Sequence, residues 1–143
     1  MPEKETIERA RQDKREGKAP STQAGEFVRE EIEHIREGKH GARSTKQAIA
    51  IGLSKARRAG VELPPSETSS EETKEQAKRD LRKAGKETKS AKRSRATRKA
   101  LKREGRSAAS KEALSRQARA AAKRRSKASR SRSAKKAAAT RKK

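Results

Sequence analysis

Lysine and arginine are the residues whose number and placing in this sequence point most clearly to a chemistry. The chain of 143 residues holds 43 of them against 19 acidic residues, which gives a formal net charge of +24. Residues 81–143 contain 26 basic and 3 acidic side chains, whereas residues 1–65 contain 14 and 11. Because dense Lys and Arg side chains neutralise phosphates and release counterions, the carboxyl-terminal part predicts sequence-independent binding to a polyanion.

The candidate nucleic-acid-binding residues form two groups, one in each half of the chain. The smaller group lies on and just before a predicted helix and consists of Arg43, Lys46, Lys55, Arg57 and Arg58. The larger group, the tail group, lies within residues 86–143. Its members are Lys92, Arg93, Arg95, Arg98, Lys99, Lys102, Arg103, Arg106, Arg116, Arg119, Lys123, Arg124, Arg125, Lys127, Arg130, Arg132, Lys135, Lys136, Arg141, Lys142 and Lys143.

The sequence does not predict an enzyme or a metal site. The chain has no cysteine, which excludes disulfide bonds and cysteine-ligated zinc. His34 lies on the predicted polar side of a helix and His40 in a glycine turn, without a second ligand at metal spacing. We therefore expect two solvated histidines, no metal and no cofactor. No serine has the histidine and carboxylate partners of a catalytic nucleophile, so we expect no enzymatic activity.

The apolar residues predict an all-α fold whose centre is a small helical hairpin over residues 20–65. Its first helix lies between Gly25 and Gly38, with the apolar residues on one face and Glu30 on the opposite, polar face. An amino-terminal arm or short helix is expected over residues 1–19. Because so small a unit is often stable only as a dimer, the hairpin is also a candidate homodimer interface.

The second helix of the hairpin has clear start and stop signals. The run Ser44-Thr45-Lys46-Gln47 matches a capping box, in which the Ser44 hydroxyl accepts from the Gln47 amide. Gly60 predicts the end of the helix, and Val61 predicts an apolar residue that folds back on the last turn. Small side chains on the inner face would let the two backbones approach closely, and these are Ala48, Gly52 and Ala56.

Residues 66–85 predict an acidic, solvated spacer helix that starts near Ser70. The following Lys/Arg/Ala-rich tail, residues 86–143, has only Leu101 and Leu114 as large apolar residues. It cannot bury enough surface to offset the entropy of its ordering, so we expect it to be largely disordered in the free protein. It also lacks proline and is rich in alanine, which predicts a coil that becomes helical when phosphates relieve its charge repulsion.

The residues STKQAIAIGLSKARRAG, from Ser44 to Gly60, resemble a helix shared by a family of small basic prokaryotic and phage proteins. The resemblance is close over residues 38–60 and looser from Thr22 to Leu63. Proteins of this family are sometimes labelled DNA-binding or plasmid-stabilisation proteins. The tail is similar to the basic tails of bacterial histone-like proteins, but it has no proline. The resemblance implies a bacterial or phage origin, a helical unit and no catalytic residues.

The function expected from the sequence is non-enzymatic, largely sequence-independent DNA binding, as in a nucleoid-associated, histone-like or plasmid-maintenance accessory protein. Charge alone does not distinguish DNA from RNA, so an RNA-binding, ribosome-associated protein is one alternative. Another is an adaptor whose hairpin docks a protein partner. No run approaches the roughly 18 apolar residues of a membrane span, so we expect no membrane contact and a cytoplasmic, nucleoid-associated location.

Overall fold

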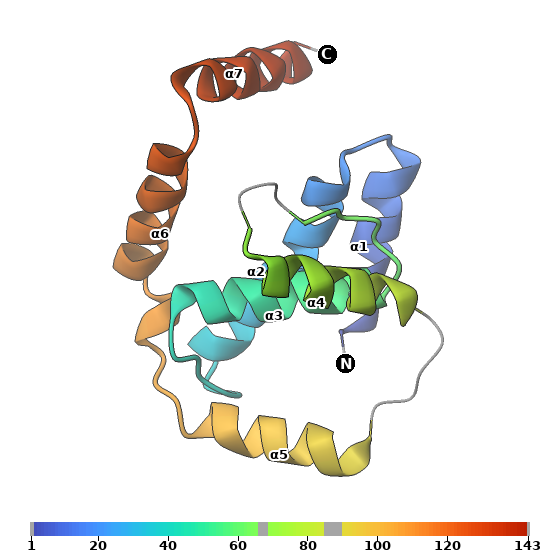
Figure 1. The fold of residues 1–143 in the computed structure, drawn as a ribbon, viewed down its shortest axis with the longest axis vertical. Helices are drawn as coiled ribbons and strands as arrows, with labels where there is room; N and C mark the ends of the chain where they lie inside the picture. Colours follow the sequence, from blue (N-terminus) through green and yellow to red (C-terminus); the bar gives the residue numbers. More distant parts are fainter. Residues whose placement is uncertain (1, 66–68, 85–89, 143) are drawn as a thin grey trace.

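The computed structural model describes residues 2–65, 69–84 and 90–142, whose regular structure is helical throughout (Figure 1). No strand occurs among these residues, as an all-α fold requires. In chain order the elements are α1 (Lys4–Arg15), α2 (Pro20–Arg36), α3 (Thr45–Arg58), α4 (Glu71–Arg82), α5 (Ala91–Lys102), the 3₁₀ turn η1 (Ser107–Ala109), α6 (Lys111–Arg124) and α7 (Lys127–Arg141).

The turns that end α1, α2 and α3 are built in the same way. Gly17, Gly38 and Gly60 adopt positive φ angles of 75°, 80° and 104°, which other residues rarely adopt. After α2, the amide of Lys39 donates to the carbonyl oxygen of His34 at 3.0 Å. This hydrogen bond satisfies a carbonyl that the helix leaves free at its end. The predicted helix ends at Gly38 and Gly60 are confirmed.

The predicted start of α3 is also confirmed. The Ser44 hydroxyl accepts a hydrogen bond from the Gln47 amide at 3.1 Å. The side chain of Gln47 accepts from the amide of Arg43 at 2.7 Å, one residue earlier than a capping box places it. The amides of Gln47 and Arg43 therefore each have a side-chain acceptor at the start of α3.

Helices α2 and α3 approach closely where small residues face each other, as the sequence predicts. Ala48 and Ala56 of α3 are fully buried. A Cβ atom built on Gly52 would lie 2.7 Å from Cα of Val28 on α2, closer than carbon atoms pack. Glycine is therefore required at this crossing.

One apolar cluster surrounds Phe27, which is 1% exposed. Ala24 and Phe27 of α2 pack with Ala10 of α1, with Ala56 of α3 and with Val61 in the segment after α3. The short amino-terminal helix expected within residues 1–19 is thus α1, and it is part of the helical core.

A second apolar cluster joins α2 to the basic tail. Ile32 and Ile35 pack there with Ala108 and Ala109 of η1, which are nearly inaccessible to solvent. The structure does not confirm the expected disorder of the tail, because its described part, residues 90–142, is helical and docks through η1. The docking depends on two buried alanines and not on large apolar residues, so the hydrophobic pattern of the tail does not predict it.

Backbone hydrogen bonds hold the end of α5 and the α5–η1 connection, residues 103–106, against the turn between α2 and α3. The amide of Gly41 donates to the carbonyl oxygen of Leu101 at 2.8 Å, and the amide of Ala42 to that of Gly105 at 3.1 Å. A Cβ atom on Gly41 would fall 2.0 Å from the carbonyl oxygen of Glu104. Only glycine permits this contact between two distant parts of the chain.

Helix α4 packs across α3, which corrects the expectation of a solvated spacer. Its capping residue is Ser70, close to the predicted start. Asp80 is 1% exposed and accepts hydrogen bonds from Oγ of Ser54 at 2.8 Å and Nε of Arg58 at 3.0 Å. Ala77 is buried in the same contact. These partners lie more than twenty residues apart in the sequence, so local patterning does not reveal the contact.

Helices α5, α6 and α7 lie along the outside of the molecule and have no buried residue. Figure 1 shows α6 following η1 along one side of the helical core and α7 extending beyond it, with α5 on the far side of α3 from α7. No helix among the described residues is long and apolar enough to cross a membrane.

Candidate nucleic-acid interface

Exposed cations cover the three outer helices. Residues 90–142 hold 21 basic and 2 acidic side chains. In the described part of the chain, none of these cations forms an ion pair with a carboxylate. Every described member of the tail group is solvent-exposed, and Lys143 lies outside the described residues. The charges of these helices are therefore available to an external anion.

The cations of α6 include a stripe along one side of the helix. Arg116, Arg119 and Lys123 are spaced by three and four residues, which places them on one face. Leu114, by contrast, packs against the second apolar cluster. The acidic residue of this helix is Glu112, in its first turn. Helix α6 thus turns an apolar side to the core and a cationic side to solvent.

A depression of about 430 Å³ lies between α2 and the start of α6, and we call it the Arg36 pocket. Its lining residues are Arg36, Arg106, Ala109, Ser110 and Lys111. Nε of Arg36 donates to the carbonyl oxygen of Ala109 at 2.9 Å, which fixes this arginine beside the tail. Three cations from separate segments thus meet at the amino-terminal end of α6, where the helix dipole also favours an anion.

Arg125 is exposed, but its side chain also forms hydrogen bonds with α7. Its guanidinium donates to the carbonyl oxygen of Ser129 at 3.1 Å and to the hydroxyl of Ser133. It lies between α6 and α7 and bonds across the first turns of α7. This residue therefore helps to set the direction in which α7 leaves α6.

The candidate cations of the hairpin divide into two kinds. Arg43 and Lys46 are exposed at the start of α3. Lys55, Arg57 and Arg58 are directed into contacts of the fold, which the sequence interpretation did not foresee.

Each of these three cations has an internal partner. Lys55 binds the buried carboxylate of Glu31, and Arg58 binds the carboxylate of α4 described above. Arg57 is 8% exposed and donates to the carbonyl oxygen of Leu63 at 2.8 Å. Burial lowers the pKa of Arg57 below its usual value. We therefore leave these three residues out of the interface.

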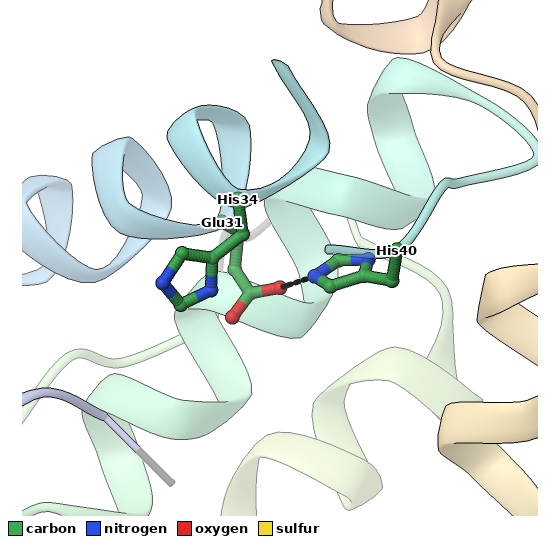
Figure 2. A group of neighbouring side chains, drawn as sticks. All are labelled: Glu31, His34 and His40. Carbon is green, nitrogen blue, oxygen red and sulfur yellow. Dashed lines mark ion pairs between the residues drawn. The ribbon is translucent and has the colours of Figure 1, made fainter. Parts of the chain in front are cut away.

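The two histidines lie on either side of a buried carboxylate rather than in solvent, which corrects the expectation for both (Figure 2). The side chains of His34 and His40 are 14% and 13% exposed, and that of Glu31 is 1% exposed. The rings meet edge to face, with their centroids 6.1 Å apart. The glycine stop after α2 turns the chain back, so His40 comes to lie against the helix that carries His34.

Each histidine has one ring nitrogen bonded to a fixed partner. Nδ1 of His40 lies 2.9 Å from the carbonyl oxygen of Gly41, and Nε2 of His34 lies 3.1 Å from Oε1 of Glu3. The hydrogen bond with His34 lowers the pKa of Glu3. The other nitrogen of each ring faces Glu31, and Nε2 of His40 is 3.2 Å from Oε2 of that carboxylate (Figure 2).

Glu30 is also buried, although the sequence places it on the polar face of its helix. It is 2% exposed and accepts from the amide of Glu3 at 2.6 Å. The spacing of Glu30, Glu31 and His34 already places them on neighbouring positions of one helix face. What the sequence lacks is any sign that the amino-terminal segment and His40 cover that face.

Residues 4–67 match a protein family described as a family of unknown function, DUF6496. The match takes in α1, α2 and α3 with the histidine cluster, and it ends before α4. No curated protein matches the chain, and no solved structure matches it.

Proposed function

We propose that this chain is a non-enzymatic DNA-binding protein that contacts phosphates through α5, α6 and α7, largely without regard to base sequence. The observation that carries the proposal is the exposure of every described tail-group cation without a carboxylate partner. Each such cation that meets a phosphate releases a condensed counterion, and this release favours binding.

Helical order supports the proposal because it spaces the charges at fixed intervals. Arg116 and Lys123 lie seven residues apart on α6, which corresponds to roughly 10 Å along the helix axis. One DNA strand presents a phosphate about every 3.4 Å of its axis, so a stripe of this length spans about three phosphates. The Arg36 pocket adds a separate point where three cations meet.

The residue types of the chain argue against stacking on unpaired bases. The chain has no tryptophan and no tyrosine, and its one phenylalanine is buried in the core. Proteins that bind single strands commonly stack the bases on exposed aromatic rings. Duplex DNA held by its phosphates therefore suits this surface better than single-stranded RNA does. Such a protein would be nucleoid-associated in a bacterial cytoplasm.

A charge-matched pair of full-length variants tests the proposal. In the first, Arg116, Arg119, Lys123 and Arg124 of α6 are all changed to Gln. In the second, the control, Lys4, Arg11, Lys14 and Arg15 of α1 are changed to Gln, which removes the same charge from another exposed surface. The measurement is the affinity for a short DNA duplex over a series of salt concentrations.

If α6 contacts phosphates, the first variant flattens the slope of log K against log salt by roughly 3 to 4, and the control leaves it almost unchanged. Equal losses in both variants would contradict the proposed location of the interface. Tighter binding to an RNA duplex than to DNA would favour the RNA alternative. Unchanged binding in both variants would also contradict that location. A wild-type chain that binds neither duplex would leave the adaptor alternative, with its protein partner on the hairpin.

A further inference from the structure

Three potential metal ligands converge between α2 and the turn that follows it. One ligand atom from each of Glu31, His34 and His40 lies within 4.8 Å of the other two. Oε2 of Glu31 is buried and has no hydrogen-bond donor. The other carboxylate oxygen, Oε1, binds the ammonium of Lys55. One oxygen is thus bound by the protein, and the other lies 3.2 Å from Nε2 of His40.

The hydrogen bonds of the two rings leave the inward nitrogens as lone-pair donors. A neutral His40 that donates from Nδ1 to the Gly41 carbonyl has its lone pair on Nε2, which faces Glu31. A neutral His34 that donates from Nε2 to the Glu3 carboxylate has its lone pair on Nδ1. Metal-bound histidines commonly donate their second N–H to a carbonyl or a carboxylate in this way.

The distance between the ligand atoms of His40 and Glu31 suits a tetrahedral ion. Zinc binds imidazole nitrogen and carboxylate oxygen at about 2.0–2.2 Å, so two tetrahedral ligands lie roughly 3.3 Å apart. Nε2 of His40 and Oε2 of Glu31 are 3.2 Å apart. With both rings neutral and no cation between them, an imidazole lone pair faces a lone pair of a carboxylate that is only 1% exposed.

We infer that Glu31, His34 and His40 form a binding site for one divalent transition-metal ion, for which zinc is the best chemical fit. Two imidazole nitrogens and one carboxylate oxygen suit zinc, whereas calcium and magnesium prefer oxygen ligands alone. The three side chains leave a fourth coordination position for water. Lys55 and Glu3 act as positioning residues, because each holds a ligand side chain through its other polar atom.

The site lies where the tail is anchored. His40 precedes Gly41, whose amide bonds the carbonyl oxygen of Leu101. An ion that joins His40 to α2 would therefore stabilise the turn on which the α5–η1 connection docks. Metal binding is expected to slow cleavage of that connection by trypsin at Arg103 and Arg106, both of which are exposed.

The experiment uses the untagged full-length chain, stripped with a chelator and titrated with zinc chloride. Isothermal titration calorimetry should show one ion per chain. The chain has two histidines, so a nitrogen-15 NMR spectrum of the imidazoles reports on both without substitution. On zinc addition, the signals of His34 Nδ1 and His40 Nε2 should move to positions typical of metal-bound nitrogen, and the other two nitrogens should keep their protons.

Variants of the same chain separate this site from the neighbouring one. A second set of possible ligands, Glu3, Glu30 and His34, shares only His34 with the first. We expect His40→Gln to weaken zinc binding by at least about 100-fold, since loss of a supporting residue alone commonly costs 10- to 100-fold. The matched control is Glu30→Gln, which changes a buried carboxylate one residue from Glu31 and should leave zinc affinity nearly unchanged.

Two results would overturn the inference. The first is a wild-type chain whose imidazole signals do not respond to zinc. The second is a His40→Gln variant that binds zinc as tightly as wild type, because the ion would then lie elsewhere. The wild-type spectrum tests the inference even if His40→Gln does not fold. None of these measurements involves nucleic acid, so the result is independent of the proposed function.

Discussion

Oγ1 of Thr45 donates a buried hydrogen bond to the carbonyl oxygen of Ala108 at 2.6 Å, across 63 residues of sequence. This bond joins the first turn of α3 to η1. Together with the bond from Arg36 to Ala109, it fixes the tail on the helical core at one place. The cations of α6, which begins two residues after η1, therefore have a defined position relative to α2 and α3.

Thr45→Val should destabilise the protein by about 1–3 kcal/mol, because it leaves the buried Ala108 carbonyl without a donor. The change keeps the shape of the side chain, so the loss is chiefly that of the hydrogen bond. Urea unfolding followed by circular dichroism measures the free energy. Thr97→Val, on the exposed surface of α5, is the control and should change it little. Equal effects of the two substitutions would show that η1 is not docked in solution.

Two glycine substitutions within helices should have opposite effects. Gly52→Ala places a Cβ atom 2.7 Å from Cα of Val28 and should cost about 1–3 kcal/mol by forcing α2 and α3 apart. Gly25→Ala meets no atom within 4 Å and should stabilise α2 by about 0.5–1 kcal/mol. Thermal melting of both variants measures the difference. A Gly52→Ala variant as stable as Gly25→Ala would contradict the close crossing.

The raised pKa of Lys18 predicts that the folded protein loses stability at alkaline pH. Its hydrogen bond with Asp13, aided by one with Glu16, raises its pKa from 10.5 to about 12. The folded chain then holds this proton more tightly than the unfolded chain does. The stabilisation is complete below pH 10.5 and disappears as the pH rises through about 12. Lys18→Gln should therefore melt below wild type at neutral pH, and the difference in Tm should shrink over that range.

The matched control for Lys18 is Lys14→Gln, in the last turn of α1. Lys14 forms no ion pair among the described residues. Its removal should leave a small difference in Tm that does not follow the same range of pH. A difference for Lys18→Gln that stays constant from neutral pH to pH 12 would rule out the ion pair as its cause.

The ends of α2 and α3 and the start of α3 could be predicted from the sequence. The predicted start of α2 was wrong, because the helix begins at Pro20 and runs through Gly25. The distant contacts could not be predicted. Capping at Ser44 and the stops at Gly38 and Gly60 depend on neighbouring residues, and all three are confirmed. The docking of η1 depends on two alanines and on backbone hydrogen bonds from residues far away in the chain. Alanine occurs both in buried contacts and on solvated helices, so its positions do not reveal the docking. The sequence therefore predicts a disordered tail.

The candidate sites show the same limit. Charge density identifies α5–α7 as the cationic region, because exposure is the usual state of lysine and arginine. The same rule wrongly predicts that Arg57 and Lys55 face solvent. Arg57 is buried, and Lys55 binds Glu31. The histidine cluster could not be foreseen because His40 reaches α2 only through the reversal of the chain at Gly38.

The salt dependence of wild-type binding to a short DNA duplex of arbitrary sequence tests the central claim most directly. If about eight phosphates are neutralised, log K should fall with log salt at a slope of about −7, and scrambled duplexes should give the same slope. A slope near zero, or affinity confined to one duplex sequence, would contradict binding by exposed phosphate-neutralising cations.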